Sequence, residues 1–330
     1  NGLSLAIVWN AAISAQSVTD VGNMMAFMQY SLHIIMSFMF VSMMFILMPR
    51  ALVSANRIGE VLNSDVAIQN LPDAKPAENM NGVLKFENVS FTYPGGVNEP
   101  VLQDICLEVK PGETLAVLGA TGVGKTTLIN LIPRFYDATE GEVFFNGVNV
   151  RDYDINYLRE RIGIVPQKNE LFSGSILDNL RWGNPQATQE EAEWAAKIAQ
   201  ADGFIRSFPE GYQTVIGQKG ASLSGGQRQR LAIARAILKR PELFIFDDSM
   251  SALDLATDAA LRKALRENLH GTTVIMIAQR IASVMDADRI AVLDGGRMIA
   301  CAPHSELMES CAVYRDIYDS QLRKEVAFHG

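Results

Sequence analysis

The chain has 330 residues, enough for two domains, and it is acidic, with a formal net charge of −8. General binding to a phosphate backbone needs clustered Lys and Arg, so this composition argues against a nucleic-acid partner. The three cysteines, Cys106, Cys301 and Cys311, form no CxxC pair, which argues against a disulfide framework or a zinc site and fits a reducing compartment.

The N-terminal part of the chain is apolar over lengths that suit a membrane. Residues 1–19 carry no charge, and no charged residue lies between Asp20 and Arg50. We predict a full membrane span over about residues 22–48, because the 25 residues Met24–Met48 would extend roughly 37 Å as a helix. A soluble core helix rarely continues this far without a charge.

Shorter segments surround this span. Residues 2–9 cannot cross a bilayer alone and are predicted to end an earlier span, which leaves residues 11–20 as an external turn. Residues 1–62 are therefore expected to form the end of the transmembrane domain of a longer, multi-pass protein in contact with membrane lipid.

The charges after the span predict its orientation. Arg50 and Arg57 follow it, and positive flanks favour the cytoplasm, so everything after Pro49 is expected to be cytoplasmic in a protein of the cell membrane. Arg50–Leu62 has helical spacing and should continue the helix into the cytoplasm. The polar, Pro-containing residues 63–82 are predicted to be a linker to a domain over 83–330.

This domain has the pattern of a mixed α/β protein. Short β-rich runs come first, such as "VLKFENVSFTY" and "EVFFNG". Helical stretches and buried strands follow, such as "LAIARAILK", "LFIFDD", "TTVIMIA" and "RIAVLD". Alternating strands and helices predict a mostly parallel sheet, and the early β-rich part predicts an antiparallel subdomain beside it.

A phosphate-binding loop is predicted at "GATGVGKT", which fits G-x-x-x-x-G-K-[ST] between a strand-like and a helix-like segment. Backbone N–H groups of such a loop surround phosphates, and the helix N-terminus adds partial positive charge. Lys125 is expected to reach the β- and γ-phosphates of ATP, and Thr126 to hold Mg²⁺. The predicted cofactor-binding residues here are Gly119, Ala120, Thr121, Gly122, Val123, Gly124, Lys125, Thr126 and Thr127.

A second Mg²⁺-side carboxylate is expected at the end of a buried strand. "ELFIFDD" supplies it, because four apolar residues lead directly to Asp247. The alternative is that Asp247 is an ordinary solvated carboxylate at a strand end. The presence of the phosphate-binding loop favours the Mg²⁺ role.

The stretch "LSGGQRQRLAIARA" resembles the signature of ABC transporter ATPase domains. Its Ser and two Gly would form a second anion site at a helix N-terminus, facing the γ-phosphate of a nucleotide on another subunit. The resemblance implies a P-loop ABC ATPase with an antiparallel β subdomain and a helical subdomain, preceded by transmembrane helices. It also implies a dimer in which each ATP lies between the P-loop of one domain and the signature of the other.

The resemblance assigns roles to further residues. Tyr93 in "FTYPG" would stack on adenine, and Gln167 in "IVPQKNELF" would be the Q-loop residue that touches Mg²⁺. The segments "LIPRFYD" and "TVIGQKG" look more like exporters than importers. The signature residues that would act on the partner's ATP are Ser224, Gly225, Gly226 and Gln227, and the D-loop residues are Ser251 and Asp254.

Two positions depart from the family pattern for strong catalysis. Asp248 stands where the presumed general base is normally Glu, and Gln279 stands where the switch residue is normally His. A shorter carboxylate is badly placed to activate water, and Gln can neither carry a positive charge nor shuttle a proton. We therefore interpret Asp248 and Gln279 as a degenerate, slowly hydrolysing site beside a complete signature, although neutral drift in a homodimer would give the same residues.

These features predict one half of an asymmetric ABC exporter, which couples ATP binding and hydrolysis to the export of an unidentified substrate. Its partner would be a second ABC half-transporter, in a heterodimer, that carries the Glu and the His. The alternatives are a nucleotide-gated regulatory or channel-like ABC membrane protein and a homodimeric exporter with slow ATPase activity. A soluble ABC ATPase is disfavoured by the uncharged segment Met24–Met48.

Overall fold

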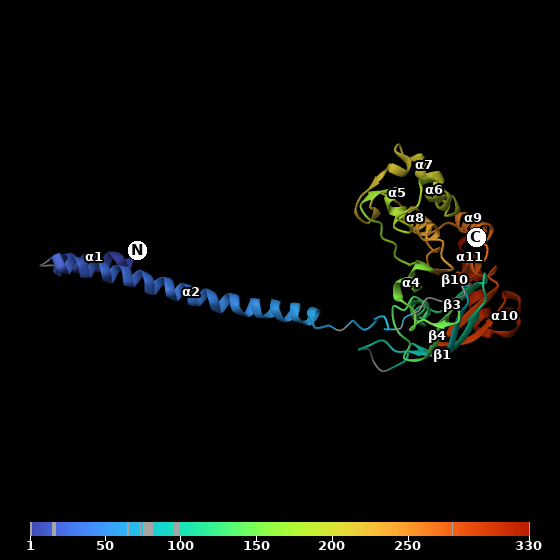
Figure 1. The fold of residues 1–330 in the computed structure, drawn as a ribbon, viewed down its shortest axis with the longest axis horizontal. Coiled ribbons are helices and arrows are strands. Elements are labelled where there is room, and N and C mark those ends of the chain that lie inside the picture. Colours follow the sequence, from blue (N-terminus) through green and yellow to red (C-terminus); the bar gives the residue numbers. More distant parts are fainter. Residues whose placement is uncertain are drawn as a thin grey trace. The chain divides into compact units, whose positions relative to one another are not determined.

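The protein is described by a computed structural model that covers residues 2–14, 18–64, 66–72, 74, 82–95, 99–278 and 280–329. It divides into two compact units, Asn1–Ala67 and Ile68–Gly330, and Figure 1 shows the elements of each. The two units are treated separately below.

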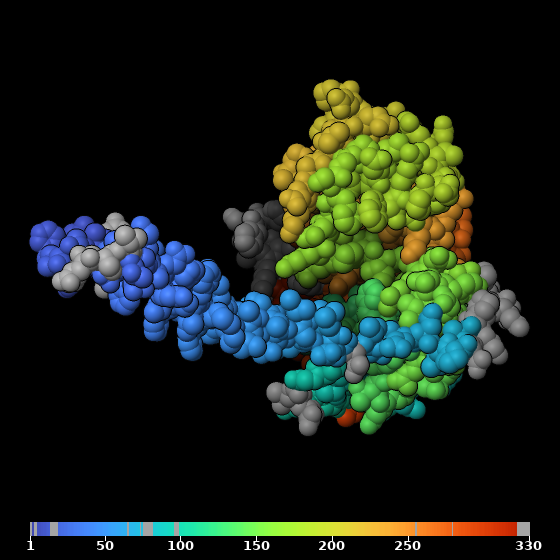
Figure 2. Space-filling model, turned by 60° about the vertical axis from the view of Figure 1, so that its left-hand side comes forward, coloured from blue at the N-terminus to red at the C-terminus, as the bar shows by residue number. Residues whose placement is uncertain are grey.

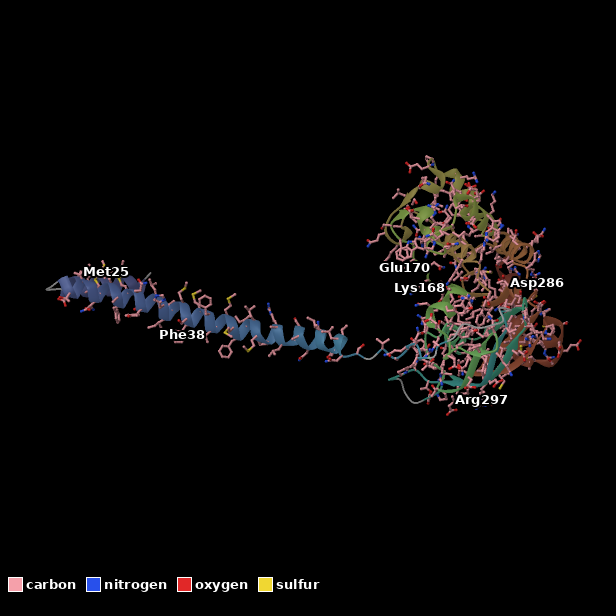
Figure 3. All side chains as sticks on the ribbon, viewed as in Figure 1. Met25, Phe38, Lys168, Glu170, Asp286 and Arg297 are labelled. Carbon is pink, nitrogen blue, oxygen red and sulfur yellow. The ribbon has the colours of Figure 1, made fainter. Side chains whose placement is uncertain are left out.

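The first unit consists of the helices α1 (Gly2–Ser14) and α2 (Val18–Leu62). Within the described residues, Thr19–Leu62 of α2 is the one helix long and apolar enough to cross a membrane by length and composition. Its large apolar side chains are exposed along the helix, and Figure 3 shows Met25 and Phe38 projecting from it, with Phe38 70% exposed.

The external turn predicted over residues 11–20 is wrong for most of that stretch. Residues 11–14 belong to α1 and residues 18–20 to α2, while residues 15–17 lie outside the described part. The segment contains neither Gly nor Pro, and its alanines are strong helix formers, so the helix of residues 2–9 continues to Ser14.

The second unit contains an antiparallel sheet with the strand order β2-β1-β4-β5. Side chains of β1 alternate between core and surface on either side of a register shift, so that Phe86 is buried before the shift and Val89 and Phe91 after it. The bounds of these strands are β1 Leu84–Phe91, β2 Leu102–Val109, β4 Glu140–Phe145 and β5 Val148–Asn149.

A six-stranded sheet has the order β12-β11-β3-β10-β9-β6, and only the edge pair β11–β12 is antiparallel among its described strands. Its parallel strands are continuously apolar because helices or the other sheet cover both faces. Leu115, Val117 and Ile275 of this sheet share a core with Phe86 and Phe145 of the antiparallel sheet. The bounds are β3 Thr114–Gly119, β6 Ile162–Val165, β9 Leu243–Asp247, β10 Thr273–Ile277, β11 Arg289–Asp294 and β12 Arg297–Ala302.

A helical subdomain extends from the sheets as a separate lobe, yellow-green to yellow in Figures 1 and 2. It packs α5, α6 and α8 around alanine-rich surfaces such as Ala192, Ala195 and Ala232. The helices of this unit are α3 Lys125–Leu131, α4 Ile155–Glu160, α5 Ile176–Arg181, α6 Gln189–Ile198, α7 Asp202–Ser207, α8 Gly225–Leu238, α9 Leu255–Asn268, α10 His304–Ser310 and α11 Ala312–His329, and a short pair β7 Gly174–Ser175 and β8 Val215–Ile216 joins two of the loops.

These elements confirm the predicted fold class, a P-loop α/β fold with an antiparallel β subdomain and a helical subdomain. Part of the segment predicted as a linker belongs to the second unit, which begins at Ile68. The Asn70 amide donates to Asp154 Oδ2 (2.6 Å), and its Oδ1 accepts from the backbone N–H of Ile155 (2.8 Å), so Asn70 binds the N-terminus of α4.

Candidate nucleotide site

The glycine-rich loop follows β3 and leads into α3. Gly124 precedes α3 with φ +103°, a left-handed conformation that a side chain would strain, and a Cβ there would lie 2.8 Å from the Leu102 side chain. At Gly119 a Cβ would lie 2.5 Å from the Leu293 carbonyl oxygen. The loop therefore needs glycine at these positions to pass between the two sheets and present the N-terminus of α3.

Lys125, the first residue of α3, is buried with 8% of its surface exposed. Its Nζ donates to the carbonyl oxygens of Gly119 and Ala120, both at 2.8 Å. Burial lowers the pKa of Lys125, and the nearby Asp248 and Asp247 carboxylates partly oppose that change. The ammonium group therefore lies against the loop, within reach of any group that the loop encloses.

Thr126 and Asp247 meet although they are 121 residues apart in the chain. The Thr126 hydroxyl lies 3.0 Å from Asp247 Oδ1 and 3.3 Å from Oδ2. Burial raises the pKa of Asp247, while the hydrogen bond from Thr126 lowers it in part. The Thr126 hydroxyl and the Asp247 carboxylate lie at the end of a parallel strand, beside the Gln167 amide. Together these groups form a set of oxygen ligands that suits Mg²⁺.

Asp248 follows directly and is 7% exposed. Gln167 Nε2 donates to its Oδ2 at 3.2 Å, and the Ser251 hydroxyl donates to its carbonyl oxygen at 2.9 Å. The backbone of Asp248 has φ +48°, the left-handed region that Asp tolerates better than most residues. Gln279, the second residue interpreted as degenerate, lies outside the described residues.

Tyr93 lies in the same site. Its hydroxyl is 3.0 Å from that of Thr127 on α3, so the ring is joined to the helix that follows the phosphate loop. A cavity of about 340 Å³ connects these groups, and its lining residues are Tyr93, Val101, Thr121, Gly122, Gly124, Lys125, Thr126, Thr127, Gln167, Asp247, Asp248 and Ile277.

The structure thus brings together the residues predicted for base, phosphate and Mg²⁺ binding. Gly119 and Ala120 are absent from the described lining but accept hydrogen bonds from Lys125, and Val123 is partly buried against the core. Val101 and Ile277 were not predicted. No motif marks them: Val101 precedes β2 of the antiparallel sheet and Ile277 ends β10 beside β3, so the two residues meet at the cavity only through the packing of the two sheets.

The signature residues form the N-terminus of α8 and are absent from the described lining of this cavity. Ser224 Oγ accepts from the Gln227 N–H (3.2 Å), and Gln227 Oε1 accepts from the Ser224 N–H (2.9 Å), which forms a capping box. Ser224 and Gly225 are exposed, so the N-terminal N–H groups face outward. The geometry agrees with an anion site that serves a nucleotide bound elsewhere.

The two predicted D-loop residues lie between β9 and α9. Ser251 is bonded to the backbone of Asp248, as described above. Asp254 caps α9, accepting from the backbone N–H of Thr257 at 2.9 Å, and these backbone and side-chain hydrogen bonds from Thr257 lower the pKa of Asp254.

Comparison with known proteins identifies the family of this domain. Residues 102–251 match the family model described as ABC transporter. The chain is 42% identical over 326 residues to an uncharacterized ABC transporter ATP-binding protein of Mycobacterium bovis, which covers 97% of this chain and 56% of the relative. It is 40% identical over 272 residues to the putative multidrug export ATP-binding/permease protein YgaD of Bacillus subtilis, covering 82% of this chain and 47% of YgaD.

A solved structure is similar as well. The structure of a bacterial Atm1-family ABC exporter with ATP bound superposes with a TM-score of 0.77 at 30% identity, covering 97% of this chain and 56% of that chain. The chain thus spans little more than half the length of these relatives. With the phosphate loop, the Asp247 carboxylate and the signature helix in place, the domain that contains residues 102–251 has the P-loop ABC ATPase fold and matches the ABC transporter family.

Proposed function

We propose that this chain is the ATP-binding half of an ABC exporter whose own phosphate loop binds ATP and hydrolyses it slowly, while its signature completes a productive site on a partner half. The observation that carries the proposal is the pairing of a complete set of nucleotide-binding groups with a shortened carboxylate at Asp248. The similarity to YgaD and to the Atm1-family exporter supports export as the process that the ATP cycle drives.

The binding groups have separate tasks. Tyr93 stacks on the adenine base, and the N–H groups of the loop and of α3 surround the phosphates. Lys125 exchanges its bonds to the Gly119 and Ala120 carbonyls for bonds to phosphate oxygens, which carry full charge and are stronger acceptors.

Thr126, Asp247 and Gln167 would hold Mg²⁺. The ion would offset the negative charge of the β- and γ-phosphates when bound. Asp247 must be ionised for this role. Burial raises the pKa of its carboxyl group, and a divalent cation bound beside it would favour the ionised form.

Asp248 limits the rate at this site. Its carboxylate is held by Gln167, and the side chain is one methylene shorter than the Glu expected at this position. A base that stands back by about 1 Å loses much of its ability to orient and activate water. General base catalysis is worth about 10²–10⁴ in rate, so its loss leaves binding intact and hydrolysis slow.

The signature is not impaired in the same way. Ser224 is a satisfied N-cap, and among the described residues a Cβ at Gly225 would meet nothing within 4 Å, so the start of α8 is open. We propose that these N–H groups bind the γ-phosphate of ATP on the partner's phosphate loop, and that most hydrolysis in the dimer takes place there.

A site-resolved ATPase measurement tests this function. The transporter is assembled with a partner half and trapped with radiolabelled nucleotide and vanadate, and the label on each half is counted. Trapping concentrated on the partner half supports the proposal, and equal trapping on both halves would contradict it.

A further inference from the structure

The aromatic side chains around Tyr93 form a cluster whose role the phosphate motif leaves open. Tyr93 meets Phe91 with ring centroids 4.8 Å apart and planes at 85°, and it meets Tyr136 at 5.2 Å and 87°. Phe91 and Tyr136 also touch each other, at 5.5 Å and 57°. Edge-to-face contacts of this kind are favourable, and together they restrict the orientation of the Tyr93 ring.

Tyr136 lies in a turn that connects the two halves of the nucleotide site. On one side, the N–H of Phe135 donates to the Asn130 carbonyl of α3 (3.0 Å), so the turn continues directly from the phosphate-loop helix. On the other side, the N–H of Thr139 donates to the Ser90 carbonyl (2.9 Å), and Thr139 Oγ1 accepts from the N–H of Thr92 (3.0 Å). The turn is therefore bonded to the strand end that carries Tyr93.

The turn is also braced internally. Arg134 is 4% exposed and has φ +53°, and its Nε donates to Asp137 Oδ1 at 2.8 Å. Its Nη1 donates to the Arg151 carbonyl at 3.0 Å. A buried guanidinium with these bonds fixes the backbone on both sides of Tyr136.

We propose that Tyr136 is a positioning residue for base recognition, which holds the Tyr93 ring in the orientation that stacks on adenine and links that orientation to α3. This inference rests on the proposed nucleotide site. Tyr136 touches Tyr93 rather than the nucleotide, so it acts on the base alone. The phosphate contacts come from the loop and Lys125, which Tyr136 does not reach in any described hydrogen bond or ring contact.

The test compares ligands with and without a base on the full chain in lipid nanodiscs. Calorimetry with Mg²⁺ measures the affinity for ATP and for inorganic tripolyphosphate in the original chain, in Tyr136→Ala and in Tyr136→Phe. Aromatic pairs contribute about 0.5–1.5 kcal/mol, so Tyr136→Ala should weaken ATP binding about threefold to tenfold. Tripolyphosphate affinity should not change, and Tyr136→Phe should restore ATP affinity because the described contacts of Tyr136 are made by its ring.

Two further variants separate the explanations. Phe135→Leu removes the neighbouring ring, which packs on Arg159 with 5.1 Å between the guanidinium and the ring centroid, and it should leave ATP affinity unchanged. In a Tyr93→Ala background, Tyr136→Ala should have no further effect on ATP. Equal losses for ATP and tripolyphosphate, or an additive loss in the double variant, would overturn the role of Tyr136. If Tyr93→Ala itself leaves ATP affinity unchanged, the proposed base site fails instead.

Discussion

The Gln167 amide lies 3.2 Å from the Asp248 carboxylate, which connects the loop after β6 to the residue after β9. Both side chains line the cavity beside Lys125. A Glu at position 248 would carry its carboxylate one methylene further from the backbone. In the proposed function this shorter reach, together with Gln279, slows hydrolysis at this site.

The charge of Lys125 should decide phosphate affinity. Lys125→Met keeps much of the side-chain volume and removes the ammonium group, so we expect ATP affinity to fall by about tenfold or more, since charge-assisted hydrogen bonds are roughly twice as strong as neutral ones. Lys263→Met on α9, where the side chain is 75% exposed, is the control and should bind ATP normally. Calorimetry on both variants measures the difference, and similar affinities would refute the assignment of the phosphate loop.

Asp247→Asn should make the domain more stable while abolishing Mg²⁺-dependent nucleotide binding. Burial raises the pKa of Asp247 above its value in the unfolded chain, so the ionised carboxylate destabilises the folded state at neutral pH. That cost is fully present above the folded pKa and disappears below the unfolded pKa. Asparagine can still accept the hydrogen bond from Thr126.

The measurement is the unfolding midpoint of both chains in denaturant between pH 8 and pH 4, without Mg²⁺ or nucleotide. The advantage of Asp247→Asn should be largest at pH 8 and should shrink as the pH falls through the raised pKa. If the stability of Asp247→Asn relative to the original chain instead increases toward acid pH, the prediction is contradicted, because the ionised carboxylate then stabilises the folded state.

Restoring the two family residues should speed hydrolysis at this phosphate loop. Asp248→Glu with Gln279→His replaces the base and the switch residue, and general base catalysis predicts a gain of about tenfold or more in the rate at this site. Steady-state phosphate release from the transporter is the readout, with a Walker-loop lesion in the partner so that only this site turns over. If the hydrolysis rate does not increase, the cause of slow hydrolysis lies elsewhere, for example in the partner's signature.

The motifs made most of the site predictable from sequence, because their chemistry is local. The glycines, Lys125 and Thr126 are within eight residues of one another, and the strand–loop–helix pattern around them is unambiguous. Asp247 was predicted because a phosphate loop needs a second carboxylate at the end of a buried strand, and the structure places it 3.0 Å from the Thr126 hydroxyl. Tyr93 and Gln167 were assigned only through the resemblance to ABC ATPase domains.

Other features depend on contacts between distant segments and left no sequence pattern. Tyr136 contacts Tyr93, which is distant in the chain. Val101 becomes part of the cavity only through the packing of the two sheets. The docking of Asn70 on α4 joins residues 84 positions apart, and the polar composition of its neighbours resembles any linker. Residues 11–14 continue α1 where a turn was predicted, because they contain no Gly or Pro that would end the helix and their alanines favour it.

The proposed asymmetry between this chain and a partner half is tested most directly by two lesions in this chain. Gly226→Asp places a carboxylate at the N-terminus of α8, against the γ-phosphate expected there, and Asp248→Asn removes the remaining carboxylate of the slow site. A Cβ at Gly226 would lie 3.5 Å from the Ala252 carbonyl oxygen, an ordinary contact, so the substitution should fold. Gly226→Asn has the same shape without the charge and serves as the control.

The decisive measurement is the steady-state ATPase rate of the assembled transporter carrying each variant. Gly226→Asp should abolish nearly all activity, Gly226→Asn should retain more of it, and Asp248→Asn should leave most of the rate in place. If Asp248→Asn is as damaging as Gly226→Asp, both sites hydrolyse ATP equally, and the division of labour between this chain and its partner is contradicted.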